Sequence, residues 1–259
     1  MPPPRSYHTQ AVIIRKTKLG EADRILTLYT PDLGKIQGFA KGVRKTKSKL
    51  SGHLELLTHS QVTLARGKNI DTIIGSQTIS AFLPLKSNLG LTSYGLYITE
   101  LVSQFTVEHV ADRPLFDLLL DTLHCLCRDC DQELLTRYFE LHLLNEAGYR
   151  PQLEHCVSCQ TPLNKSHGYF CPSAGGVLCP RCSHYQSFSY HVSVTGLEVL
   201  SRLQRSNEPL NLNISQDLSA ELARVMRHYI KYLLDREVRS AVWLDSLKRQ
   251  AGKGCLPLL

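Results

Sequence analysis

The sequence contains few aromatic residues and no long apolar segment. Aromatic residues make up 7% of its 259 residues, and there is a single Trp. No uninterrupted apolar run approaches the roughly 18 residues that a membrane-spanning helix needs. Residues 1–15 lack the apolar stretch of a secretory signal, so we expect neither a signal peptide nor a membrane anchor. These absences predict a cytoplasmic protein in a reducing compartment, without a membrane partner.

Motifs of the common catalytic and nucleotide-binding sites are absent as well. The sequence has no phosphate-binding GxxxxGK[ST] loop, no GxGxxG after a strand, no GxSxG and no HExxH. Asp121, Asp129 and Asp131 lie too close to expected helix ends to suggest a two-metal nuclease. We therefore expect neither an enzyme nor a small-molecule substrate.

Acidic residues are scarce at the start of the chain. Residues 1–50 contain eleven Lys or Arg and three Asp or Glu, an excess of eight positive charges. The remaining residues contain 19 basic and 20 acidic groups, so the whole formal charge of +7 arises from the first fifth of the sequence. This asymmetry predicts an anionic partner, with nucleic acid ahead of a membrane surface. A basic solubilising tail is disfavoured because the cations are interleaved with strand-like apolar residues.

Short β-type segments fill the first 80 residues. They comprise residues 11–14, 23–30, 34–41, 61–65 and 70–74. Residues 31–34 have turn chemistry and join the second and third segments as a hairpin. Five short strands predict a small closed barrel of the OB type, with an SH3-like barrel as the alternative. Residues 41–49 carry five cations and no acid, and we expect them to form a mobile loop.

From about residue 84 the apolar residues recur at helical spacing. Helical patterns cover residues 115–123, 134–148 and 219–234, and another helix begins near residue 194. Gly148 followed by Pro151 is a helix stop signal. We expect an α+β chain with an OB-type barrel at residues 1–80, a helical domain at 81–247 and a C-terminal tail at 248–259.

Two pairs of cysteines have the spacing of a zinc ribbon. Cys156 and Cys159 form one C-x2-C motif, and Cys179 and Cys182 form a second after nineteen residues. Four thiolates supply the tetrahedral ligand set that zinc prefers, and metal binding would order an intervening segment that is poor in core-forming residues. We predict one structural Zn²⁺ per chain, in a module at about residues 153–186 inserted in the helical domain.

Other residues could replace a ligand in this set. Cys171, His155, His167 and His184 are the alternatives, whereas Cys125, Cys127 and Cys130 lie in a helical context and are expected to have no metal. A deaminase-like catalytic zinc has a formal H-x-E at His53 to Glu55. Leu178 rather than Pro precedes Cys179, however, and four cysteines would leave no open position for water.

An OB barrel binds single strands by combining a cationic groove with stacking aromatic rings. Tyr29 and Phe39 are the strand aromatics of the basic region, and we expect Phe39 in the core. Binding should therefore rest on phosphate contacts, depend strongly on salt and show little sequence preference. A second charged face, of Arg224, Arg227 and Lys231 on one helix, is usually only solvated.

Several segments resemble the bacterial RecO family over roughly residues 8–247. Residues 20–24 (GEADR), 27–31 (TLYTP), 33–35 (LGK) and 40–44 (AKGVR) resemble its N-terminal barrel. Residues 138–141 (YFEL), 148–151 (GYRP) and the two Cys pairs resemble its helix-to-zinc junction. A general basic zinc-ribbon accessory factor is the alternative, and it would lack a helix-rich second half.

The resemblance implies a non-catalytic recombination mediator of the RecF pathway. Such nucleoid-associated proteins bind single- and double-stranded DNA and anneal complementary strands. They bind RecR and the C-terminal tail of SSB directly. They act indirectly with RecF and RecA by helping RecA to load. The SSB tail would dock on the helical domain, with Arg224, Arg227 and Lys231 as candidates for its cationic rim. The candidate DNA-binding residues are Arg15, Lys16, Arg24, Lys41, Arg44, Lys45, Lys47 and Lys49.

Overall fold

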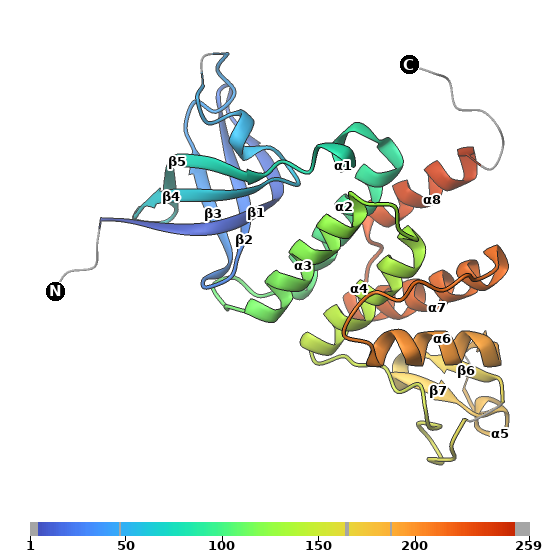
Figure 1. Cartoon of the computed structure of the whole chain (residues 1–259). Coiled ribbons are helices and arrows are strands. Elements are labelled where there is room, and N and C mark those ends of the chain that lie inside the picture. Colours follow the sequence, from blue (N-terminus) through green and yellow to red (C-terminus); the bar gives the residue numbers. More distant parts are fainter. Residues whose placement is uncertain (1–4, 47, 164–165, 187, 252–259) are drawn as a thin grey trace. The chain divides into compact units, whose positions relative to one another are not determined.

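The computed structural model describes residues 5–46, 48–163, 166–186 and 188–251 (Figure 1). The described residues form two compact units. Among the described residues, the first unit comprises residues 5–128 and 243–251, and the second comprises residues 129–242. The two units are defined by the compactness of the chain and not by independent folding. The domain boundaries predicted at residues 80 and 247 therefore stay predictions. Among the described residues, no helix combines the length and apolar character that crossing a membrane requires.

Five strands of the first unit close into a barrel, as the sequence predicts. Their order around the barrel is β1-β2-β3-β5-β4, and every pair is antiparallel except β3 with β5. The strands are β1 (Ser6–Leu19), β2 (Asp23–Thr30), β3 (Gly34–Ala40), β4 (His59–Ala65) and β5 (Asp71–Ser80). β1 is much longer than predicted because its first half pairs with β4 and its second half pairs with β2, so both polar ends of the strand have a partner.

Alternate strand residues form the interior of the barrel. Ile13, Leu26, Leu28 and Leu64 are fully buried there, as the period of two along a strand requires. Tyr29 points to the opposite face of β2, where it is also fully buried and its ring lies 6.2 Å from that of Phe116. The expected placing of Phe39 in the core is wrong, since this side chain is only half-buried.

The basic segment after β3 is a loop, as predicted, and its mobility stays a prediction. Residues 41–46 form successive turns that are bound to the β1–β2 turn. The Arg44 amide donates to the carbonyl of Ala22 at 2.9 Å, and the Gly42 amide donates to Asp23 Oδ1 at 2.6 Å. Val43 is buried within the barrel core. The sequence did not indicate this apolar anchor, because Val43 has no apolar neighbours at regular spacing.

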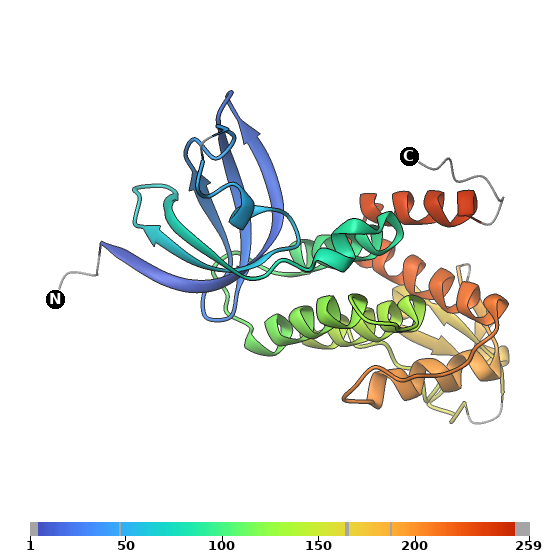
Figure 2. The same ribbon diagram turned by 45° about the horizontal axis from the view of Figure 1, so that its top comes forward.

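Helices on one side of the barrel complete the first unit (Figure 2). They are α1 (Leu83–Ser87), α2 (Leu89–Phe105), α3 (Arg113–Leu126) and the last part of α8 (Arg239–Ala251). Lys35, at the start of β3, donates to the carbonyls of Ser103 and Thr106 at 2.6 Å each and so caps the C-terminal end of α2. Burial lowers the pKa of Lys35, against the opposing effect of Glu108. The helix α3 begins at a capping aspartate, Asp112.

The second unit combines three long helices with a small sheet and the short helix α5 (Pro180–Ser183). The helices are α4 (Gln132–Glu146), α6 (Val194–Arg205) and α7 (Gln216–Leu234), and α4 packs against both others. The sheet has the order β7-β6-β8, from β6 (Gly168–Cys171), β7 (Gly176–Leu178) and β8 (Tyr190–Val192). The predicted helices are confirmed, with Asp131, Ser193 and Ser215 as N-caps. The helix-rich second half argues against a minimal zinc-ribbon protein.

Two glycines with positive φ test how closely the turn before β3 approaches the segment of residues 107–112. Gly20 (φ +57°) is in open space, whereas a Cβ on Gly34 (φ +63°) would lie 1.9 Å from the carbonyl oxygen of Val110. We expect Gly20→Ala to cost roughly 1 kcal/mol for its left-handed backbone alone. Gly34→Ala should cost at least about 3 kcal/mol, because the 107–112 segment must also move. Denaturant unfolding of both variants measures this difference, and equal costs would contradict the close approach.

Candidate metal centre and nucleic-acid interface

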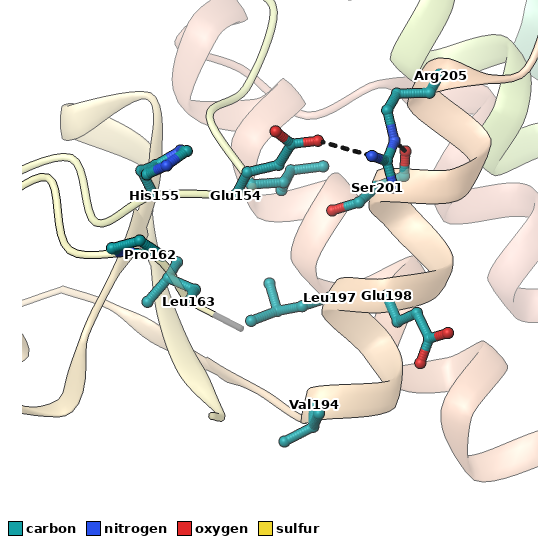
Figure 3. A pocket seen from close by; sticks show the side chains of 10 residues that line it. Glu154, His155, Pro162, Leu163, Val194, Leu197, Glu198, Ser201 and Arg205 are labelled. Atoms are coloured by element: carbon teal, nitrogen blue, oxygen red, sulfur yellow. Dashed lines mark hydrogen bonds and ion pairs between the residues drawn. The ribbon is translucent and has the colours of Figure 1, made fainter. Parts of the chain in front are cut away.

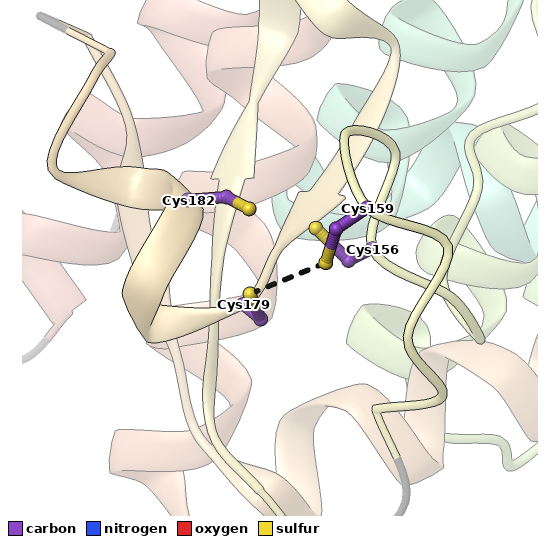
Figure 4. Close-up of side chains that lie close together, drawn as sticks. All are labelled: Cys156, Cys159, Cys179 and Cys182. Atoms are coloured by element: carbon purple, nitrogen blue, oxygen red, sulfur yellow. Dashed lines mark hydrogen bonds between the residues drawn. The ribbon is translucent and has the colours of Figure 1, made fainter.

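Four cysteine side chains meet in the second unit. The Sγ atoms of Cys156, Cys159, Cys179 and Cys182 all lie within 4.8 Å of one another (Figure 4), and those of Cys159 and Cys179 are 3.7 Å apart. Cys156 and Cys179 are buried, whereas Cys159 is exposed. Such a group has the ligand number and type of a closed structural zinc site.

Each cysteine pair is held by a short turn. In the first, the Cys156 amide donates to Thr161 and the Gln160 amide donates to Cys156, both at 2.9 Å. In the second, Cys179 is the N-cap residue of α5 (Pro180–Ser183), which carries Cys182. These two turns bring together two cysteine pairs that nineteen residues separate in the sequence.

The structure distinguishes among the ligand sets that the sequence left open. Across the described ranges, the four paired cysteines are the one cluster of His, Cys, Asp or Glu suited to a metal ion. Cys171 lies outside it, with its Sγ 3.2 Å from Ser173 Oγ. The rings of His167 and His191 lie 5.3 Å apart in a separate group with Tyr169. Cys125 and Cys127 are likewise outside the cluster.

The thiol pKa values show the effect of crowding four such groups. Hydrogen bonds with the side chain and backbone of Thr161 lower the pKa of Cys159 to about 6. A hydrogen bond with Ser158 lowers the pKa of Cys182, but hydrogen bonds with the thiols of Cys179 and Cys159 outweigh it and raise that pKa to about 12. Four thiolates within 4.8 Å of one another would also repel each other. A divalent cation that replaces the shared protons would allow all four to ionise.

The cysteine module is supported by packing that the sequence pattern did not reveal. Phe170 of β6 is fully buried, and its ring lies 5.1 Å from that of Tyr229 on α7 in an edge-to-face arrangement. The Tyr229 hydroxyl donates to the carbonyl of Tyr149 at 3.0 Å. A Cβ on Gly176 would lie 2.5 Å from the carbonyl oxygen of Gln152. The backbone of β7 therefore closely approaches the segment that leads into the turn of Cys156 and Cys159, which we call the first knuckle; the turn of Cys179 and Cys182 is the second knuckle.

A cavity of about 510 Å³ lies between the first knuckle and α6 (Figure 3). Leu153, Leu163 and Leu197 provide apolar walls. Glu154 and Arg205, which also line it, form an ion pair at 3.3 Å. The two opposite charges neutralise each other, so this pair adds no net charge to the cavity.

The basic residues of the barrel gather where β1 turns into β2. Because Arg44 and Gly42 bond to residues 22 and 23, the cations of this segment lie beside Arg24. Lys41, Arg44, Lys45 and Lys49 are exposed. Lys47 lies outside the described residues, and Arg15 is exposed on β1. Lys41, Arg44 and Lys45 therefore form a group of exposed cations at this end of the barrel.

Two of the predicted DNA-binding cations have an acidic partner within the protein. Lys16 forms an ion pair and hydrogen bond with Glu55, and Arg24 Nη1 lies 3.9 Å from Glu55 Oε1. Their side chains are 12% and 24% exposed. No sequence pattern indicates this pairing, because Glu55 lies between β3 and β4 and meets the two cations only when the barrel closes.

The cations of α7 do not form a continuous stripe. Arg224 is exposed and Arg227 is half-buried. Lys231 is exposed but pairs with Glu237, whose Oε1 lies 2.5 Å from Lys231 Nζ. The helix thus presents fewer available cations than its sequence pattern suggests.

Comparison with known proteins gives matches along nearly the whole chain. The family profile "Recombination protein O N terminal" matches residues 4–82, and "Recombination protein O C terminal" matches residues 86–241. DNA repair protein RecO of Dehalococcoides mccartyi is 48% identical over 251 residues, covering 96% of this chain and 99% of that protein. RecO of Roseiflexus sp. is 36% identical, covering 95% and 87%, and RecO of Pelotomaculum thermopropionicum is 34% identical, covering 96% and 97%.

Proposed function

This chain belongs to the recombination protein O (RecO) family, and on that premise we propose that it is a non-catalytic mediator that binds and anneals DNA. Family membership supports a role in DNA repair and recombination. The observation that carries the finer proposal is the group of exposed cations around the β1–β2 turn, where Lys41, Arg44 and Lys45 lie beside Arg24.

Annealing requires no catalytic residue. Two complementary strands repel each other through their phosphates, and a protein that neutralises several phosphates lowers this repulsion and concentrates both strands. Base pairing then proceeds without ATP. Tyr29 is buried, so base stacking on it is unavailable and the proposed binding rests on charge. Single- and double-stranded DNA present the same phosphates and should both bind.

The four clustered cysteines would hold one structural zinc ion. They supply a complete tetrahedral set, which leaves no open position for a catalytic water. Zinc would join the two knuckles and stabilise the sheet that packs on α7. Its role in this proposal is to maintain the fold of the second unit.

The protein partners in this proposal follow from family membership. We include RecR and the C-terminal tail of SSB as direct partners, and RecF and RecA as indirect ones. Arg224 would be the main cation of a tail-binding rim on α7, with Arg227 and Lys231 as secondary members because the first is half-buried and the second is paired with Glu237. In this arrangement the mediator would help RecA to load on SSB-coated DNA.

Reversing two exposed charges at the barrel should weaken DNA binding irrespective of sequence. We expect Arg44→Glu with Lys45→Glu to lower affinity for all oligonucleotides about equally. The log–log salt dependence should flatten by roughly 0.7 to 0.9 for each phosphate that the variant no longer neutralises. The control is Arg181→Glu with Arg202→Glu, an equal change of net charge in the second unit. Fluorescence anisotropy across a salt series measures both. An equal loss of affinity in the control variant would show that overall charge, not this surface, determines binding.

Strand annealing should depend on the same exposed cations of the barrel. The protein should accelerate annealing of two complementary SSB-coated strands without ATP, and the acceleration should decline with salt and in the Arg44→Glu, Lys45→Glu variant. A strand-pairing assay with labelled oligonucleotides tests this. Intact DNA binding without acceleration would rule out the mediator role while leaving a DNA-binding protein.

Loss of a cysteine ligand should release zinc and destabilise the second unit. We expect Cys179→Ser to abolish stoichiometric zinc in elemental analysis and to lower the free energy of unfolding by about 3 kcal/mol or more. Cys127→Ser, which lies outside the cluster, should retain zinc and lose little stability. A zinc-free wild type that is as stable as the zinc-loaded protein would refute the structural metal.

A further inference from the structure

Glu55 lies at the centre of a group of three cations at the end of the barrel. It pairs with Lys16 and Arg24, and it also acts electrostatically on Lys86 of α1. The Lys86 ammonium donates to Thr58 Oγ1 at 2.5 Å, three residues beyond Glu55 along the chain. Three cations therefore surround one carboxylate, and the group has a net charge of two positive units.

The segment that carries Glu55 is fixed to the barrel. It follows the short helix η1 (Gly52–Leu54), and Leu54 and Leu57 are both buried. The Leu57 amide donates to the carbonyl of Ile13, and the Ile13 amide donates to the carbonyl of Thr58, both at 3.0 Å. Leu57 has a φ of +55°, a conformation that costs free energy for a branched residue and that these contacts maintain. Glu55 is thus held in place beside the cations.

The strand register explains why the cations converge. Lys16 is paired with Leu26, and Arg24 lies two residues before Leu26 on the same face of β2. Leu26 is in the barrel core, so Lys16 and Arg24 extend along the row of inward-facing residues toward the end of the barrel. Glu55 is more exposed than either, at 51% against 12% and 24% for the side chains. The carboxylate therefore lies nearest to solvent.

The cations are poorly satisfied by one carboxylate. Burial lowers the pKa of Lys86; Glu55 opposes this shift, and the neighbouring charge of Lys16 adds to it. A backbone phosphate of nucleic acid resembles a carboxylate, because it shares one negative charge between two oxygens that accept hydrogen bonds. One phosphate can therefore take the place of Glu55, and neighbouring phosphates of the same strand can compensate the remaining positive charge.

We propose that Lys16, Arg24 and Lys86 form a phosphate-binding site for nucleic acid, and that Glu55 is its internal counter-ion, which a backbone phosphate displaces. This inference rests on the proposed DNA-binding function of the barrel and extends it to Lys86, outside the strands. Because the phosphate must compete with Glu55, the site is weakened in the native chain. DNA that engages the exposed cations of residues 41–45 first would raise the local concentration of phosphate and so favour the exchange.

The test compares Glu55→Gln with Asp121→Asn, which changes the net charge equally at an exposed carboxylate on α3 of the same unit. With labelled oligothymidine we expect Glu55→Gln to bind about three- to tenfold more tightly than Asp121→Asn. The log–log salt dependence of Glu55→Gln should also steepen by roughly 0.7 for the additional phosphate that is bound. Adding Lys86→Gln to Glu55→Gln should reverse most of the gain. Thermal unfolding verifies that each variant is folded.

Equal affinities of Glu55→Gln and Asp121→Asn would overturn the inference, and the proposed DNA binding would stand if the wild type still binds with a strong salt dependence. Absence of DNA binding by the wild type and by Glu55→Gln at low salt would instead overturn the proposed function. Titration with inorganic phosphate distinguishes the source of the ligand. Tighter binding of inorganic phosphate by Glu55→Gln, without any gain for DNA, would refute nucleic acid as the ligand.

Discussion

The double pairing of β1 is the constraint on which the first unit depends. One half of this strand pairs with β4 and the other half with β2, and the barrel closes because a single strand bridges both. Closure fixes which residues face inward. Lys16 and Arg24 then share the inward-facing row with Leu26, and their charged ends must leave the core at the end of the barrel. There they meet Glu55 and the turns of residues 41–46.

The same closure changes how the charge of the chain should be counted. Eleven cations in the first 50 residues suggest a uniformly basic surface. In the folded barrel Lys16 and Arg24 are partly neutralised by Glu55, and Lys35 caps a helix. Affinity for a polyanion depends on the cations that are free to release their counter-ions when phosphate binds. The exposed cations of residues 41–45 are therefore more important for the proposed DNA binding than the total charge.

The small sheet of the second unit depends on its surroundings for stability. The sheet of β6, β7 and β8 is built from strands of three or four residues, which is too small for a stable core of its own. It is stabilised by the packing of Phe170 on Tyr229 and by the two knuckles that end at the cysteine cluster. Four thiols within 4.8 Å compete for protons. A metal ion would remove this competition, so the proposed zinc would act on stability through the chemistry of its ligands.

Local patterns along the chain were sufficient to predict the five-stranded barrel, the helical second half and the four cysteines that cluster, whereas the family was predicted from the resemblance of segments such as residues 20–24. The signals are alternation with a period of two, helical spacing, turn residues and paired C-x2-C motifs. Three-dimensional packing was needed to show that Tyr29 rather than Phe39 is buried, that residues 41–46 are bound to the β1–β2 turn, and that Glu55 joins Lys16 and Arg24. Each of these depends on residues that are far apart along the chain and meet only through strand register and barrel closure. Periodicity along the sequence indicates which face of a strand or helix a residue occupies. It does not indicate which residues of other elements pack against that face.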